Sequence, residues 1–167
     1  MPFIVSNGDV ELHNEGMNDK LISTGLDLYP TILDYANIPR PKDLLGESLK
    51  PVLEVGKEKN AREFVVVETK FEGKHAHGTM GRALIDKKYK YILYSWGKNR
   101  EQFLDLESNP FEMDNLAGLK SQTSKIDEYR QKLLNWCQDT GDTKFLRKLM
   151  LPTKSMMSSS ELFITSY

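Results

Sequence analysis

Cysteine, an excess of charge of one sign and long apolar runs are all scarce in this sequence of 167 residues. The one cysteine, Cys137, excludes an intrachain disulfide and a zinc site built from several cysteines. Lysine and arginine number 23 against 24 aspartate and glutamate residues, so no net field attracts the chain to nucleic acid or to an anionic membrane. We therefore expect neither nucleic acid nor membrane as a partner.

Apolar stretches are short as well. The longest, at residues 64–67, has the length of a strand and falls far below the ~20 residues that span a bilayer. The first residues, MPFIVS, lack the basic region and long apolar region of a signal peptide. Residues 3–5 instead indicate a short buried strand, which the turn signal at residues 6–9 ends.

The pattern becomes helical from Ser23 or Thr24, either of which is suited to cap a helix. Pro39 and Pro41 are expected to stop this helix, and residues 46–54 to add a further helical turn. Apolar residues recur at helical spacing on one face: Leu26, Tyr29, Ile32, Leu33 and Ala36. We expect the core of the helix to contain Leu26, Leu28, Tyr29 and Leu33, because such a helix must bury one face.

The second half of the chain is predicted to form a sheet followed by a helix. Its four predicted strands are residues 63–70, 82–86, 89–94 and 102–106. The short spacers between them favour antiparallel neighbours, since parallel pairing needs a crossover of a dozen or more residues. Thr123 or Ser124 then begins a helix that Gly141 ends. Together these elements predict an α+β fold with one helix covering the four-stranded sheet.

A charged connector at residues 56–60 marks the expected boundary between the two halves. We divide the chain into residues 1–58, residues 59–141 and a tail at 142–167. Within the tail, residues 145–151 are compatible with a short amphipathic helix, and the Ser- and Met-rich residues 155–160 are typical of a linker.

Three patterns together resemble the sulfatase family, and they occur in the family's order. The first comprises PFIVS at 2–6, ISTGLDLYPTILDYANIP at 22–39 and LGESL at 45–49, similar to the end of the large α/β domain of sulfatases. The second is GRALIDKKYKYI at 81–92, and the third is EQFLDLESNPFEMDNLA at 101–117; both resemble the C-terminal subdomain. The resemblance implies a remnant of the large α/β domain followed by the C-terminal sulfatase subdomain.

The chemistry implied by this resemblance requires parts that the sequence does not contain. Sulfatases use a formylglycine, made within a Cys/Ser-x-Pro-x-Arg motif, and a calcium ion held by oxygen ligands. The motif is absent, and Cys137 lacks the proline and arginine that would follow it. We interpret Cys137 as a small buried hydrophobe. The sequence therefore predicts a sulfatase fragment without catalytic residues, inactive alone, with calcium and formylglycine in its full-length parent.

For that parent, the resemblance implies hydrolysis of sulfate esters, with a sulfated glycan or an aryl sulfate as substrate and a periplasmic or secreted location. The remainder of the sulfatase domain would be the partner of this portion. Two alternatives stay open: a fragment of a related phosphodiesterase or phosphonate hydrolase, and a stand-alone, non-catalytic binding or interaction module.

The segment KHAHGTMGR at 74–82 is the candidate site for substrate contact. It places cationic and hydrogen-bonding groups beside glycines, in a subdomain that borders the active site in sulfatases. Arginine suits an anion because its guanidinium offers a bidentate fork. A solvated loop and a metal site at the His-x-His pair are the alternatives. The predicted substrate-binding residues are Lys74, His75, His77 and Arg82.

Two other clusters have structural interpretations. Lys87, Lys88 and Lys90 are expected to form a solvated hairpin turn. Trp96 with Tyr91 and Tyr94 would suit stacking on a sugar ring, but cross-strand aromatic packing is the preferred interpretation.

Overall fold

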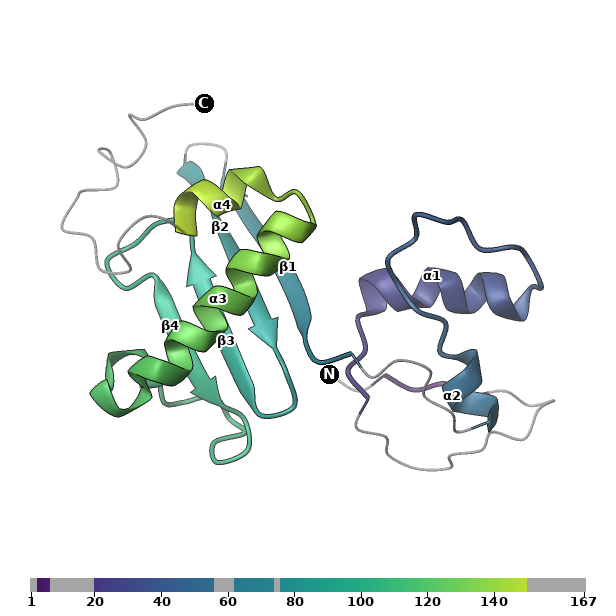
Figure 1. Cartoon of the computed structure of the whole chain (residues 1–167), viewed down its shortest axis with the longest axis horizontal. Helices are drawn as coiled ribbons and strands as arrows, with labels where there is room; N and C mark the ends of the chain where they lie inside the picture. Colours follow the sequence, from purple (N-terminus) through teal and green to yellow (C-terminus); the bar gives the residue numbers. More distant parts are fainter. Residues whose placement is uncertain (1–2, 7–19, 56–61, 74–75, 150–167) are drawn as a thin grey trace. The chain divides into compact units, whose positions relative to one another are not determined.

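The computed structural model describes residues 3–6, 20–55, 62–73 and 76–149, and the chain divides into two units. The helical unit comprises Met1–Val65, and the sheet unit comprises Val66–Tyr167 (Figure 1). No helix in the described part of the chain is long and apolar enough to cross a membrane.

The helical unit contains α1 (Thr24–Tyr35) and α2 (Lys50–Val55). Ser23 is the N-cap of α1, as predicted, although its side chain makes no capping hydrogen bond. The helix ends at Tyr35, before the two prolines, because Asn37 adopts a left-handed conformation with φ 55°. The N–H groups of Asn37 and Ile38 donate to the carbonyls of Asp34 and Leu33, which is the Schellman arrangement.

Most of the α1 side chains predicted to be buried are exposed to solvent. Leu33 is buried as expected, but Leu26, Tyr29 and Ile32 are 42%, 53% and 55% exposed. Leu28 and Ala36 are exposed too. The residues that α1 buries are Asp27, Pro30, Thr31 and Leu33. The predicted helix core is therefore wrong for Leu26, Leu28 and Tyr29: helical spacing identifies an apolar face but not what covers it.

The sheet unit contains four strands in the order β1-β2-β3-β4. They are β1 (Val65–Gly73), β2 (Ala76–Ile85), β3 (Tyr89–Tyr94) and β4 (Glu101–Asp105). The register pairs β2 with β3 and β3 with β4 in antiparallel fashion. This four-stranded antiparallel sheet confirms the predicted fold class. Strand β2 begins earlier than expected, however, so Thr79 to Arg82 lie in a strand and not in a loop.

Helix α3 (Thr123–Asp139) crosses one face of the sheet (Figure 1). Leu84, Tyr91 and Phe103 are paired across β2, β3 and β4, so their side chains share a face, and all three are fully buried. Tyr129 of α3 lies on them, with its ring centroid 5.1 Å from that of Phe103. Ile126, Leu133 and Cys137 complete the buried face of α3. Aromatic and branched side chains thus form the core between helix and sheet.

The packed unit continues beyond residue 141. Gly141 adopts a positive φ of 70° and ends the turn after α3, and α4 (Thr143–Leu149) follows. Helix α4 packs against α3, and Phe145 is fully buried. The tail predicted from residue 142 therefore includes a helix that belongs to the fold. Residues 155–160, predicted to be a linker, lie outside the described residues.

The outer edge of β4 is covered by the segment that follows it. The Asn115 side chain accepts a hydrogen bond from the Phe103 N–H at 3.0 Å and donates one to the Glu101 carbonyl at 3.2 Å. It thereby occupies the backbone groups that an additional strand would use. Two 3₁₀ turns, η1 (Leu116–Gly118) and η2 (Lys120–Gln122), then lead into α3.

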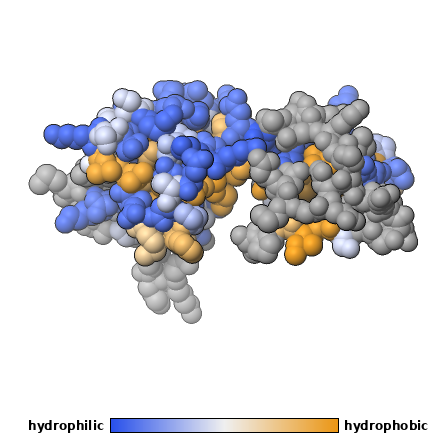
Figure 2. Space-filling model, turned by 90° about the horizontal axis from the view of Figure 1, so that it is seen from below, coloured by the Kyte–Doolittle hydropathy of each residue, from blue (hydrophilic) through white to orange (hydrophobic). Residues whose placement is uncertain are grey.

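Hydrophobic atoms reach the surface of both units between hydrophilic ones (Figure 2). Among the described residues of the sheet unit, the exposed large apolar side chains are Val67, Phe71, Phe111, Met113 and Leu119. In the helical unit they are Phe3, Ile4, Leu26, Leu28, Tyr29, Ile32, Ile38 and Leu45. Single exposed apolar residues are ordinary on a protein surface, but several on one helix indicate a face that normally meets a partner.

Candidate functional site

The predicted substrate-contact segment lies only partly within the described residues. Lys74 and His75 lie outside them, and His77 is described only through its backbone, which belongs to β2. Substrate contact by these three residues stays a prediction.

Arg82 is described in full, and its side chain points into the protein. It is 6% exposed and lies on the face of the sheet that α3 and α4 cover. Its Nε donates to Asp142 at 2.8 Å, its Nη1 to the Gly81 carbonyl at 2.8 Å, and its Nη2 pairs with Glu68 at 2.9 Å. The guanidinium also lies 4.8 Å from the ring centroid of Phe145.

These contacts occupy each of the three guanidinium nitrogens of Arg82. A guanidinium already bound by two carboxylates of its own chain is poorly suited to capture a sulfate group. We therefore interpret Arg82 as the residue that ties β2 to β1 and to the start of α4, instead of as a substrate ligand. Its partner Asp142 is sixty positions away in the sequence, so local sequence context gives no sign of this role.

A second, partly buried ion pair joins β4 to α3. Glu101 receives hydrogen bonds from Arg130 at both carboxylate oxygens, at 2.7 and 2.6 Å, and from the Tyr91 hydroxyl at 2.7 Å. Burial, followed by the neighbouring Glu101 charge, raises the pKa of Tyr91 above its ordinary value. Tyr91 is therefore a neutral hydrogen-bond donor at physiological pH, and this cluster is a structural network of satisfied polar groups.

The hairpin lysines form exposed ion pairs. Lys88 pairs with Glu107 at 2.7 Å, and Lys90 pairs with Glu112 at 2.7 Å. Glu112 itself has a φ of 57°, unusual for a residue with a side chain. Exposed pairs of this kind contribute little to stability. They fit the predicted solvated turn and give no indication of a ligand site.

Cys137 is fully buried on α3, in agreement with its interpretation as a small hydrophobe. Burial, with a further contribution from the Asp142 charge, raises the pKa of its thiol to about 11. A thiol with so high a pKa is a poor nucleophile at neutral pH.

The helical unit contains a polar cluster centred on Asp27. Its carboxylate accepts hydrogen bonds from the guanidinium of Arg62 and from two backbone N–H groups, those of Ser23 and Glu47. Burial raises the pKa of Asp27, but these hydrogen bonds outweigh burial and leave it below its ordinary value. Asp27 is thus a charged, fully partnered carboxylate.

The described residues do not fit a catalytic calcium site. Among them, no group of three or more histidine, cysteine, aspartate or glutamate side chains is placed to hold a metal ion. The carboxylates of Asp27, Glu101 and Asp142 are bound by arginines instead. The full sequence also lacks the Cys/Ser-x-Pro-x-Arg motif. No step of sulfate hydrolysis can therefore be assigned to the described side chains.

Comparison with known proteins identifies the family to which this fold belongs. The family model described as "N-sulphoglucosamine sulphohydrolase, C-terminal" matches residues 1–139. The chain belongs to this sulfatase family. It corresponds to the C-terminal portion of a sulfatase.

Individual sulfatases agree with the family match. The delta 4,5-hexuronate-2-O-sulfatase of Bacteroides thetaiotaomicron is 32% identical over 133 residues, which cover 80% of this chain and 27% of that protein. A solved 2-O GAG sulfatase superposes with a TM-score of 0.70 at 28% identity, covering 84% and 32% of the two chains. A protein solved in complex with its substrate D-glucosamine-2-N,6-O-disulfate gives a TM-score of 0.59 at 26% identity, covering 70% and 24%. The chain thus spans about a quarter to a third of the length of these proteins.

The structure also reveals polar residues that the sequence analysis missed. Asp27 with Arg62 and Glu101 with Arg130 are pairs separated by 35 and 29 positions. One sequence signal existed for the first pair. Asp27 stands among apolar residues of a helix, a position where a charged residue requires a partner.

Proposed function

We propose that this chain is the C-terminal portion of a glycan sulfatase and completes the enzyme without performing hydrolysis itself. The observation that carries the proposal is the family match over residues 1–139, together with the absence of the formylglycine motif from the sequence. The nucleophile and the calcium ligands would be supplied by the part of the enzyme that this chain does not contain. The exposed apolar face of α1 supports this proposal, since it offers a surface for the remainder of the α/β domain.

Sulfated glycans are the substrate class that the relatives favour. One relative is named for a hexuronate 2-O-sulfate, and another was solved with a glucosamine disulfate. The complete enzyme would hydrolyse sulfate esters of such sugars, with calcium and formylglycine as its catalytic groups. Lys74, His75 and His77 would lie near the sugar or the sulfate, and the enzyme would act in the periplasm or outside the cell.

An activity measurement tests whether this chain can hydrolyse a sulfate ester by itself. The purified chain, incubated with an aryl sulfate and with a sulfated disaccharide in the presence of calcium, should release no sulfate above the buffer control. Without an activated nucleophile and a preorganised charge-stabilising site, little remains to lower the barrier. Calcium-dependent sulfate release by the chain alone would refute the proposal.

Reading the genomic DNA upstream of Met1 separates this proposal from a stand-alone binding module. A continuous reading frame that encodes Cys/Ser-x-Pro-x-Arg supports the enzyme portion. A stop codon followed by a promoter supports the module. Calorimetric titration of the purified chain with the sulfated disaccharide adds an independent result, because only a module that works alone is expected to bind it tightly.

A further inference from the structure

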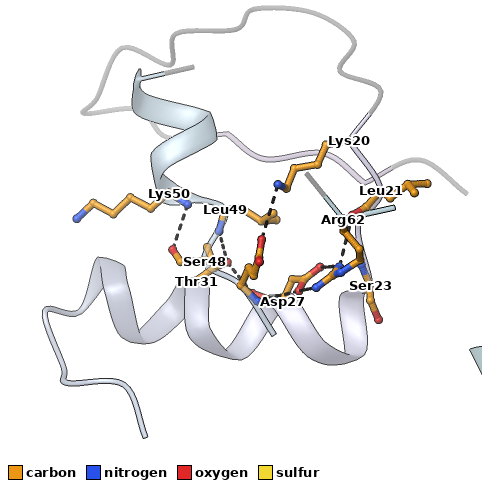
Figure 3. Close-up of polar contacts among 10 residues, drawn as sticks. Lys20, Leu21, Ser23, Asp27, Thr31, Ser48, Leu49, Lys50 and Arg62 are labelled. Atoms are coloured by element: carbon orange, nitrogen blue, oxygen red, sulfur yellow. Dashed lines mark hydrogen bonds and ion pairs between the residues drawn. The ribbon is translucent and has the colours of Figure 1, made fainter. Parts of the chain in front are cut away.

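A buried carboxylate connects three separate segments of the helical unit. Asp27, in the first turn of α1, is 1% exposed and accepts four hydrogen bonds (Figure 3). The N–H of Ser23 donates at 2.8 Å and the N–H of Glu47 at 3.0 Å. Arg62 donates through both terminal nitrogens, at 2.7 and 2.8 Å. One side chain therefore joins the start of α1, the loop before α2 and the segment that leads to β1.

Arg62 is the most remote of these partners. It lies 35 positions from Asp27 and three residues before β1 begins at Val65. Its side chain is only 18% exposed, and its guanidinium also reaches the Leu21 carbonyl at 3.4 Å. The parallel pair of N–H···O bonds fixes the plane of the guanidinium as well as its distance from the carboxylate. Lysine, as a point charge, would not impose this orientation.

Two features of the backbone make room for this arrangement. Pro30 has no N–H, so the carbonyl of Leu26 lacks its helical donor. The backbone of Gly46 lies against that carbonyl, because a Cβ on Gly46 would come within 1.8 Å of the Leu26 oxygen. Proline and glycine together allow the loop to approach α1 closely enough for the Glu47 N–H to reach Asp27.

The loop before α2 has anchors of its own. The Thr31 hydroxyl donates to the Asp27 carbonyl at 2.6 Å and accepts from the Leu49 N–H at 2.9 Å. The Ser48 hydroxyl donates to Asp34 at 2.6 Å (Figure 3 shows both hydroxyls beside α1). Loss of Arg62 would therefore leave the loop attached, whereas the segment at residues 62–64 would lose its bond to Asp27.

We propose that the Asp27–Arg62 pair is a latch that fastens residues 62–64, the start of the path into the sheet, to the helical unit. A buried ion pair adds little net stability compared with apolar packing, but it can specify one arrangement among several. The latch would thus fix where the chain leaves the helical unit. This inference concerns the chain's own geometry and does not depend on the proposed reaction.

A Glu-specific protease offers a direct measurement, since Glu63 is exposed and directly follows Arg62. Native full-length chain is digested briefly, and cleavage after Glu63 is compared by mass spectrometry with cleavage after Glu107, an exposed residue of the sheet unit. Arg62→Met, Arg62→Lys and Asp27→Asn should each speed cleavage after Glu63 by roughly tenfold or more, because cleavage follows the population of the open segment. Cleavage after Glu107 should not change.

Arg62→Lys keeps the positive charge but removes the planar guanidinium that makes two parallel hydrogen bonds to Asp27. It therefore tests the latch in a variant that is expected to stay folded. Lys125→Met is the matched control, because it breaks the exposed Lys125–Glu128 pair in the sheet unit. Its digestion pattern should match that of the wild type. Unchanged cleavage after Glu63 in Arg62→Met would overturn the latch. Equal acceleration after Glu63 and Glu107 would overturn it as well, since the pair would then support overall stability and not the local segment.

Discussion

Helices α3 and α1 differ in the kind of face that each one buries: α3 buries an apolar face, whereas α1 buries a largely polar one. In the sheet unit, α3 turns Ile126, Tyr129 and Leu133 toward the strands and leaves its charged residues outside. In the helical unit, α1 turns Asp27 and Thr31 inward and leaves large apolar residues exposed. The apolar face of α3 is therefore covered within its own unit. The buried polar residues of α1 already have hydrogen-bond partners, and its exposed apolar face is available for another part of the protein.

This contrast agrees with the place of the chain in the sulfatase family. The subdomain at the C-terminal end has its own aromatic core and two structural ion pairs, Arg82 with Asp142 and Arg130 with Glu101. The helical unit resembles one edge of a larger domain, since it has a buried polar centre and an exposed apolar surface. Stability should therefore be concentrated in the sheet unit, and the first two predictions change buried residues of that unit.

The largest effect is expected from Phe103→Ala. Phe103 is fully buried, stacked 5.0 Å from Tyr89 and edge-on to Tyr129. Its truncation should lower the free energy of unfolding by about 3–5 kcal/mol, because it leaves a cavity and removes ring contacts. Urea denaturation followed by circular dichroism measures this change. Phe111→Ala is the control, since Phe111 is exposed and its loss should cost within about 0.5 kcal/mol. Similar losses for both variants would mean that the core is misassigned.

Arg82→Met should destabilise the sheet unit by about 2–3 kcal/mol. It leaves Asp142 without its cation beside α4, and part of that charge is relieved by solvent because Asp142 is not fully buried. Thermal unfolding measures the loss, with Lys88→Met as the exposed control. In the complete sulfatase, kcat/KM should fall only as far as stability does. A loss of kcat/KM at an unchanged melting temperature would restore Arg82 as a substrate contact.

Cys137 provides a pH-dependent probe of the same unit. Its pKa of about 11 leaves roughly 200-fold less thiolate at pH 8 than an ordinary thiol has. Alkylation by iodoacetamide, followed by mass spectrometry, should therefore be at least that much slower in the native chain than in urea. The raised pKa also means that stability falls as pH rises above the value for the unfolded thiol. Rapid labelling of the native chain at pH 8 would show that the helix–sheet interface opens readily.

The sequence predicts the sheet unit better than the helical unit, for a physical reason. Strand β3 has its predicted bounds, and α3 begins at Thr123, because local pattern and tertiary packing agree there. Spacing along α1 correctly identifies an apolar face, but the chain buries only Leu33 of that face and otherwise buries Asp27, Pro30 and Thr31. The ion pairs of Arg82 and Arg62 join residues that are 60 and 35 positions apart, and no local pattern specifies them. The contacts of His77 with a substrate stay a prediction.

The smallest expected effect on stability comes from a substitution on the outer face of α1, and it separates the behaviour of α1 from that of α3. Ile32 lies on the outer face of α1 and is 55% exposed, so Ile32→Ser should change the unfolding free energy of this chain by no more than about 0.5 kcal/mol. The same substitution in a complete sulfatase should cost about 1–3 kcal/mol, because the face would then be covered and serine would remove buried apolar area. Leu133→Ser on α3 is the matched control and should be strongly destabilising in both proteins. A large cost for Ile32→Ser in this chain alone would mean that its outer face is already covered. No cost in either protein would mean that α1 meets no partner there.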